Sequence, residues 1–322
     1  MAHRSRWLTG VAALLLAAAM LWLVAPGWLS RASLAISQRY LSPDGILEVQ
    51  AQQTVVRVLR VSGLVGTVWS LILLRLAADR RSEARARWLR DPLIPGAAPW
   101  IARAVLWGGT LLSAALVAAF AGRYSLGLRV FFAEDGPSEN ATVLLYGVAV
   151  LLLVRAWRAL RTVHWARRRA LVAILALLLV GCVVMAGEEL SWGQRIVGWR
   201  TPAWMQRLND QGETNLHNMV SPLFHRMRPA MAWALPLALL AAELAPKRFQ
   251  RSAWMVLVPH RALWGMLSVL AVASAVPLGE AAEVTLSLVV AAYALRLALA
   301  APRLATCLAA RSASEADALL PP

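Results

Sequence analysis

Long apolar segments recur along the whole chain, and most of them have about the length of a helix that crosses a lipid bilayer. A spanning helix needs about 17–25 predominantly apolar residues, because each residue adds about 1.5 Å to its length. Segments of this kind lie near residues 7–28, 56–77, 99–121, 141–157, 170–187, 229–245, 262–278 and 284–300. The sequence therefore predicts an all-α fold, a polytopic transmembrane helical bundle with about eight spans.

Charged residues are scarce, and most of them are arginines. Only 16% of the 322 residues are charged, against about 25% in a typical soluble domain. The chain has 33 basic and 17 acidic residues, an excess that would suggest nucleic-acid binding in a soluble protein. Here the arginines stand in short runs between the apolar segments, as in loops that lie against anionic headgroups. This placement favours membrane lipid, and not nucleic acid, as their partner.

The arginine-rich loops also predict how the chain crosses the membrane. They cover residues 75–90, 155–169 and 246–261, and an eight-helix count places all three on the same side as the basic N-terminal residues. The positive-inside rule assigns that side to the cytoplasm. We therefore expect a single transmembrane domain over residues 1–300, with both termini cytoplasmic, a short cytoplasmic tail at 301–322 and an extracytoplasmic loop at 188–228.

Most of the acidic residues fall on the opposite side in this topology, or at helix ends that face it. Acidic residues contribute little to topology, so the positive-inside rule does not require this bias. At helix starts, capping of the helix dipole explains them about as well as a shared site does. The group consists of Asp44, Glu48, Glu134, Asp135, Glu139, Glu188, Glu189, Asp210, Glu213, Glu280 and Glu283.

Two polar blocks follow the fifth apolar segment: GEELSWGQR at residues 187–195 and NDQGETNLHN at residues 209–218. If the fifth helix continues through the first block, one helix face presents Glu188, Ser191, Trp192 and Arg195. If the second block is helical, Glu213 and His217 share a face at an i, i+4 spacing, as metal ligands or an acid–base pair would require. Ion pairs of the glutamates with Arg195 or Arg200, and a loop hydrogen-bond network around Glu213, are the structural alternatives.

Together with a third block, EDGPSE at residues 134–139, these strings resemble a signature of uncharacterised bacterial multi-pass membrane proteins. The blocks cover about a quarter of the chain. The resemblance implies a shared site and a location in the bacterial plasma (inner) membrane, and it implies no particular reaction.

The adjacent glutamates Glu188 and Glu189 at a helix end are also similar to the paired glutamates of CAAX-type intramembrane proteases. In that family an arginine follows at a short fixed spacing, and a separate helix supplies a histidine. Here Gly193 stands near the position of that arginine, and Arg195 comes later. The spacing of His217 also differs from the pattern of the family.

The first functional hypothesis from these residues is a membrane-embedded enzyme acting on a lipid or lipid-linked substrate. Its catalytic candidates are Glu188, Glu189, Arg195, Glu213 and His217, with a glutamate as base and Arg195 holding an anionic group. The cofactor is unknown; a divalent metal would find oxygen and imidazole ligands at Glu189, Glu213, His217, Glu134 and Asp135. The alternatives are a transporter that binds a proton or cation, and a structural partner in a membrane assembly.

Overall fold

The structure, a computed structural model, consists of helices joined by turns and loops in the part of the chain that it describes. The described residues form helices and turns and contain no strand, so the all-α prediction is confirmed for them. They are residues 2–25, 45–78, 99–121, 127–128, 130–132, 136–161, 168–209, 213–216, 219, 230, 233–238, 240–241, 244, 257–275 and 279–317.

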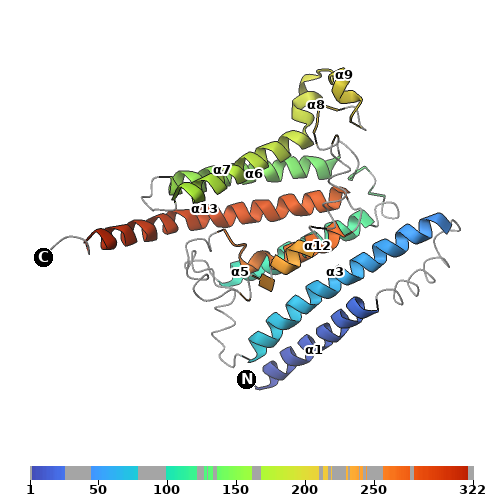
Figure 1. Ribbon diagram of the computed structural model, residues 1–322, viewed down its shortest axis with the longest axis vertical. Helices are drawn as coiled ribbons and strands as arrows, with labels where there is room; N and C mark the ends of the chain where they lie inside the picture. Colours follow the sequence, from blue (N-terminus) through green and yellow to red (C-terminus); the bar gives the residue numbers. More distant parts are fainter. Residues whose placement is uncertain are drawn as a thin grey trace. The chain divides into compact units, whose positions relative to one another are not determined.

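Seven helices of more than ten residues and four short ones make up the described elements (Figure 1). The longer helices are α1 (Ala2–Val24), α3 (Gly45–Ala78), α5 (Pro99–Ala121), α6 (Pro137–Leu160), α7 (Arg168–Glu189), α12 (Trp264–Ser274) and α13 (Gly279–Asp317). The short ones are η1 (Ser191–Gly193), α8 (Gln194–Val197), α9 (Ala203–Gln206) and η3 (Arg261–Leu263).

Five of the described helices are long and apolar enough to cross a membrane. Their apolar stretches are Val56–Leu74, Arg103–Phe120, Pro137–Leu160, Arg169–Glu189 and Glu280–Thr306. Two shorter apolar helices, Thr9–Val24 and Arg261–Ser274, coincide with two further predicted spans. Of the predicted span at 229–245, the structure describes residues 230, 233–238, 240–241 and 244, and these are helical. The described helices are thus those of a helical membrane protein with several candidate spans, as the long apolar segments of the sequence predict.

The described residues group into two compact units. The first comprises residues 1–89, 226–245 and 267–278, and the second comprises residues 90–225, 246–266 and 279–322. The single domain expected over residues 1–300 stays a prediction. At its far end, however, the helix α13 does not stop near residue 300 but continues to Asp317, because Ala301 and Leu304 extend its buried side.

In the first unit, small residues let α1 and α3 approach closely. A β-carbon on Gly63 would lie 2.8 Å from both the carbonyl oxygen of Ala19 and Cγ of Leu23, and one on Gly66 would lie 3.1 Å from Cβ of Ala19. Ser70, one turn further along α3, is fully buried and donates to the carbonyl oxygen of Gly66 at 2.7 Å. Such rows of small residues are how helices pack in lipid, where the hydrophobic effect does not drive them together.

Replacement of Gly63 by leucine is therefore expected to separate α1 from α3. The new side chain has no space against Ala19, and overpacking of this kind costs about 1–3 kcal/mol. Thermal unfolding of the purified protein in detergent should show a clear loss of stability. Gly10→Leu is the matched control, because nothing lies within 4 Å of the β-carbon position there. Equal melting temperatures for the two variants would contradict the close contact.

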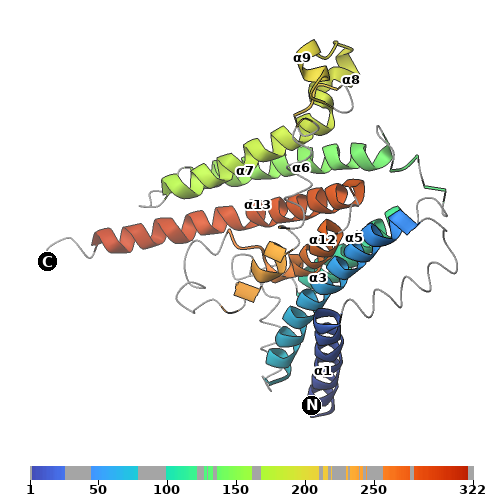
Figure 2. The same cartoon turned by 45° about the vertical axis from the view of Figure 1, so that its right-hand side comes forward.

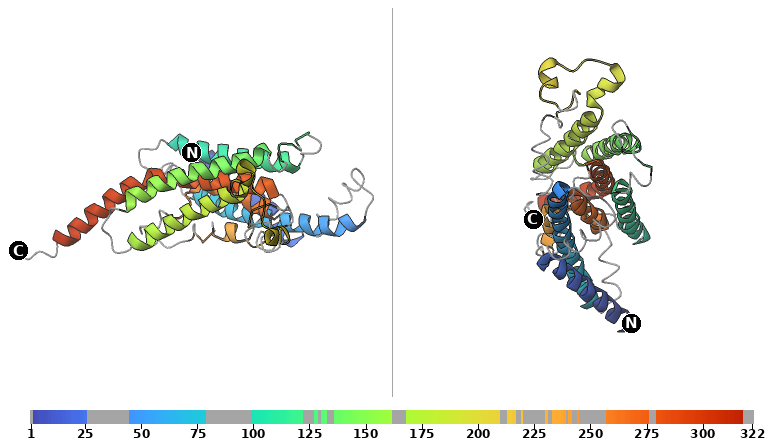
Figure 3. Two further views of the ribbon diagram at one scale, coloured as in Figure 1. Left: turned by 90° about the horizontal axis from the view of Figure 1, so that it is seen from above. Right: turned by 90° about the vertical axis from the view of Figure 1, so that its right-hand side faces the viewer.

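The second unit is built around three helices, α6, α7 and α13, that run side by side (Figure 3). The buried residues of α6 recur at alternating spacings of three and four, the heptad pattern of helices that pack along their length. They are Tyr146, Ala149, Leu153, Ala156 and Leu160, and they pack against Leu171, Leu175 and Cys182 of α7 and Ala294, Leu297, Ala301 and Leu304 of α13. This stripe is the main hydrophobic core of the unit.

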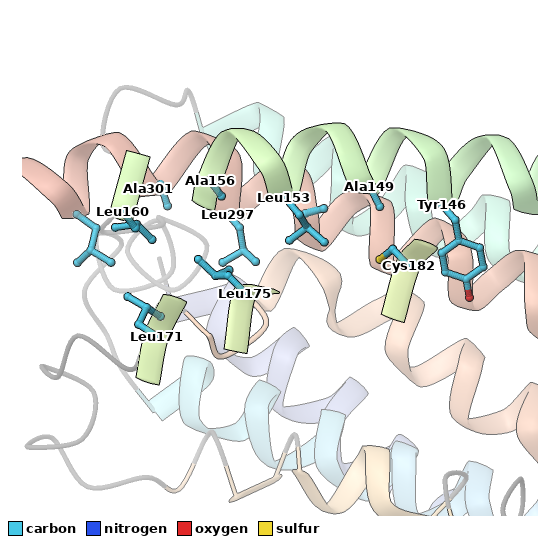
Figure 4. Packing of buried hydrophobic residues seen from close by; sticks show 13 residues of the cluster. Tyr146, Ala149, Leu153, Ala156, Leu160, Leu171, Leu175, Cys182, Leu297 and Ala301 are labelled. Atoms are coloured by element: carbon cyan, nitrogen blue, oxygen red, sulfur yellow. The ribbon is translucent and has the colours of Figure 1, made fainter. Parts of the chain in front are cut away.

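The order of contacts along the core fixes the directions of these helices. At one end Leu160 lies near Leu171, and at the other Tyr146 lies near Cys182 (Figure 4). The helices α6 and α7 are therefore antiparallel, and α13 runs parallel to α6 because Ala301 accompanies Leu160. As a result, one end of the three helices carries Arg161, Arg169 and Arg303, and the opposite end carries Glu139, Glu188, Glu189, Glu280 and Glu283.

Candidate functional site

The acidic end of α7 finishes in an abrupt turn. Ser191 and Trp192 have φ of 46° and 56°, in the left-handed region, and Gly193 follows with φ of 87°. Left-handed residues interrupt the i to i−4 hydrogen bonds of a right-handed helix. The helical continuation that would place Glu188, Ser191, Trp192 and Arg195 on one face is therefore wrong, since α7 ends at Glu189.

The turn is stabilised by the indole ring of Trp192, which folds back onto the end of α7. A β-carbon on Gly187 would lie 2.9 Å from two atoms of that ring, so a glycine is required there. The indole nitrogen donates to Oε1 of Glu188 at 2.6 Å. This contact offsets the cost of a non-glycine residue in the left-handed region, about 1–2 kcal/mol.

Glu188 joins this turn to the second polar block. Its side chain is only 4% exposed, and its other oxygen, Oε2, accepts the backbone N–H of Leu216 at 2.6 Å. Both oxygens of the buried carboxylate are thus engaged by strong donors from the folded loop. Hydrogen bonds to a charged group contribute more than neutral ones, about 1.5–3 kcal/mol each.

Glu213 makes the second connection between the two blocks. The hydroxyl of Ser191, which is fully buried, donates to Oε2 of Glu213 at 2.6 Å, and the amide of Asn215 donates to the same oxygen at 3.2 Å. Residues 213–216 are not helical, so no i, i+4 face for Glu213 and His217 forms there. His217 itself lies outside the described residues.

Amides and hydroxyls complete the network. The buried amide of Asn209 donates to the carbonyl oxygens of Glu213 and Asn215 at 2.9 and 3.0 Å. Gln194 accepts the backbone N–H of Thr214 at 2.6 Å and donates to the hydroxyl of Thr201 at 2.9 Å. We call residues 190–209 and 213–216 the cap. The polar residues of the two sequence blocks fold the cap by bonding to one another.

Glu189 points to a different environment from that of its neighbour Glu188. It occupies the next position of the α7 core stripe, after Leu178, Cys182 and Met185, and it is 7% exposed. The hydroxyl of Tyr146 on α6 lies within electrostatic range of Glu189, and also of Glu283 on α13. A carboxylate therefore stands where the heptad pattern of the bundle calls for an apolar side chain.

The core becomes polar around this carboxylate. On α6, Thr142 and Ser138 precede Tyr146 at spacings of four residues, and both are 1% exposed. The hydroxyl of Ser138 has no hydrogen-bond partner among the described residues. We call Ser138, Thr142, Tyr146, Glu189 and Glu283 the polar core. Buried polar groups are normally paired, so a free hydroxyl in such a cluster is a place for a ligand atom or a water molecule.

Tyr146 is the main residue of this region that inspection of charged motifs misses. The signal that reveals it is the heptad stripe of α6, in which Tyr146 lies opposite Cys182, one heptad before Glu189 on α7. Glu283 also differs from its expected role as a helix cap, since it lies one turn inside α13 and close to Tyr146, whereas Glu280 occupies the first turn.

The structure places three of the predicted site residues, and they fall into two groups. Glu188 and Glu213 belong to the hydrogen-bonded cap, and Glu189 belongs to the polar core. Glu134, Asp135 and His217 lie outside the described residues, as does the side chain of Arg195, and Arg200 is exposed. Within the described part of the chain, no group of three or more His, Cys, Asp or Glu residues is arranged to hold a metal ion. The metal site stays a prediction.

Comparison with known proteins finds no match for this chain among family models, curated proteins or solved structures. The resemblances drawn from the polar blocks therefore stay predictions, and the argument on function rests on the geometry of the cap and the polar core.

Proposed function

We propose that the protein is an enzyme of the bacterial inner membrane that acts on a lipid or lipid-linked substrate at the extracytoplasmic face. In this proposal eight helices span the membrane, and both termini are cytoplasmic. The observation that supports it best is the buried carboxylate of Glu189 at the end of an otherwise apolar helical core, within electrostatic range of the hydroxyl of Tyr146.

The separation of charge in the second unit supports the orientation. Arg161, Arg169 and Arg303 gather at one end of the three central helices, whereas the glutamates gather at the other. Cytoplasmic ends of spanning helices are enriched in arginine, so the basic end is the cytoplasmic one and the cap is extracytoplasmic.

Single-cysteine labelling tests this topology. In a chain whose Cys182 and Cys307 are replaced by alanine, a cysteine at Gln206 should react with a membrane-impermeant maleimide added to whole cells, because Gln206 is exposed on the cap. A cysteine at Val163 should react only after the cells are opened. The reverse pattern would show that the bundle is inverted.

Within the site, we assign the base to Glu189 and a positioning role to Glu188 and Glu213. Both oxygens of Glu188 and one oxygen of Glu213 already accept short hydrogen bonds that fold the cap, so these oxygens are engaged by the protein itself. Glu189 lies below the cap, at the depth where the fatty chains of a lipid meet its headgroup. Ionisable groups within spanning helices are generally functional, because their insertion into the bilayer is unfavourable.

The other predicted residues fit around this base. Tyr146, with its hydroxyl near Glu189 and Glu283, is suited to relay a proton or to donate a hydrogen bond to a substrate oxygen. Arg195 and His217 keep the proposed roles of holding an anionic group and of acting as an acid or a metal ligand. A divalent metal would add polarisation of a phosphoryl or carbonyl oxygen.

The test is replacement of Glu189 by glutamine, which keeps the shape of the side chain and removes its basic oxygen. Loss of a general base lowers turnover about 10²–10⁴-fold. In a deletion strain of the native host, the variant should therefore restore neither the phenotype nor the lipid profile, at normal abundance on immunoblot. Glu280→Gln is the matched control, because removal of a first-turn carboxylate costs only about 0.3–1 kcal/mol.

A transporter is the second candidate, favoured by the presence of two carboxylates near one tyrosine hydroxyl. Such a group is suited to hold a proton or a cation between helices. Purified protein in vesicles that contain a pH-sensitive dye distinguishes the two candidates. Proton movement that follows an imposed Na⁺, K⁺ or Mg²⁺ gradient and disappears in Glu189→Gln would replace the enzyme by a transporter. Full complementation by Glu189→Gln would overturn both.

A further inference from the structure

The cap exposes a group of large apolar side chains although its interior is polar. Each is between 40% and 76% exposed, and each belongs to residue types that normally avoid water. They are Ile196, Val197, Trp199, Trp204, Leu208 and Leu216. Exposed arginines at positions 200 and 207 stand among them. Aromatic and aliphatic side chains interspersed with arginine are typical of protein segments that lie at a membrane–water interface.

The position of the cap relative to the helices of its own unit is also consistent with a membrane–water interface. The helices α8 and α9 lie to one side of the end of α7, on the side away from α13 (Figures 1 and 2). The cap therefore extends laterally, past the outer helix of the group, and does not stand above the bundle axis. A bilayer that surrounds α6, α7 and α13 would continue directly beneath it.

The length of the chain limits how far the cap can be from the bilayer. The apolar stretch of α7 ends at Glu189, and Ile196 follows only seven residues later. Three of those residues form η1, and the helix α8 begins directly after it, at Gln194. The backbone therefore changes direction within a few residues of the end of α7. The exposed side chains of α8 are consequently held near the depth of the headgroups.

We propose that the cap lies on the outer leaflet, with Ile196, Val197 and Trp204 inserted among the lipids and with Arg200 and Arg207 against lipid phosphates. The occupant of the apolar surface is the bilayer itself and not a partner protein. The arginines provide the charge complementarity, and continuity with a spanning helix brings the surface to the lipid. The inference goes beyond the proposed function and does not depend on the chemical role of Glu189.

Site-directed spin labelling tests the depth of the cap. Nitroxide labels are placed at Ile196, Val197 and Trp204 in the chain without Cys182 and Cys307, with one protein per lipid nanodisc so that a second copy cannot cover the surface. Compared with a free nitroxide in water, these labels should collide more often with oxygen, which concentrates in lipid. They should collide less often with a water-soluble nickel complex. A label at Leu177, which is 72% exposed on α7, provides the reference for lipid depth.

The role of the arginines is tested with lipid composition. In nanodiscs of phosphatidylcholine with phosphatidylglycerol, the labels should lie deeper than in phosphatidylcholine alone, and R200Q/R207Q should remove that difference. Limited proteolysis of each labelled chain shows whether its cap is still folded. Labels that are as accessible to the nickel complex as a free nitroxide, on a folded cap, would overturn the proposal. That result would leave the test of Glu189 unaffected, since the latter is read from complementation and lipid profile.

Discussion

Replacement of Glu189 by leucine should raise the stability of the protein and at the same time abolish its function. The position belongs to the α7 core stripe, in which Leu178, Cys182 and Met185 precede it and pack in the core shared with α6. A leucine continues this apolar stripe and removes the cost of burying a carboxyl group in it. A residue that lowers the stability of the folded protein and is nevertheless present is a sign of function.

The measurement combines thermal unfolding in detergent with complementation in the native host. Met185→Leu is the control, because it conserves volume within the same stripe and should change neither quantity by much. The expected combination for Glu189→Leu is a higher melting temperature and a strain that behaves like the deletion. A lower melting temperature would show that Glu189 stabilises the helical bundle. The burial of Glu189 would then be explained by structure, and it would no longer support a functional site.

Replacement of Glu188 by alanine should release the cap from the end of α7. Glu188 accepts the indole N–H of Trp192 and the backbone N–H of Leu216, both at 2.6 Å. Loss of two hydrogen bonds to a charged group corresponds to about 3–6 kcal/mol. The left-handed turn at Ser191 and Trp192 would then lose the contact that stabilises it.

Trypsin digestion of the detergent-solubilised protein measures this release, because Arg200 and Arg207 are exposed cleavage sites within the cap. The variant should be cut there much faster than the unaltered protein, while the helical core stays intact. Gln206→Ala, an exposed change in the same cap, should have no effect. Identical cleavage rates for Glu188→Ala and Gln206→Ala would mean that the carboxylate does not hold the cap.

The membrane-spanning helices could be predicted from the sequence because their signal is local. Each consists of consecutive apolar residues, and the length of that run alone decides whether it crosses a bilayer. The placement of arginines relative to these runs is equally local. For this reason, the segments Arg103–Phe120 and Arg169–Glu189 correspond closely to predicted spans. The extension of α13 past residue 300 is harder to predict from the sequence. Ala301 and Leu304 continue its buried side through a stretch that contains arginines, which resembles a polar tail.

The geometry of the site depends on contacts between distant residues, which periodicity alone does not reveal. The polar blocks drew attention to Glu188 and Glu213, but a continuous helix was the wrong geometry. Two non-glycine residues with positive φ interrupt it, and such a conformation persists only when tertiary contacts hold it. Those contacts come from Glu213 and Leu216, more than twenty residues away. Tyr146 lacks a charged motif altogether, and an electrostatic interaction between two helices is what associates it with Glu189.

The central position of α13 has a consequence for the synthesis of the protein in the cell. In the apolar part of α13, 56% of the residues are buried, against 28% in that of α6 and 17% in that of α7. Yet α7 ends ninety residues before α13 begins, and α6 ends earlier still, so both leave the ribosome well before α13 does. Until the last helix arrives, the buried side of α6 and the carboxylate of Glu189 face lipid or the insertion machinery. Ribosome stalling or truncation before Gly279 would therefore leave an unpaired acidic helix in the membrane, a species that quality-control proteases are suited to remove.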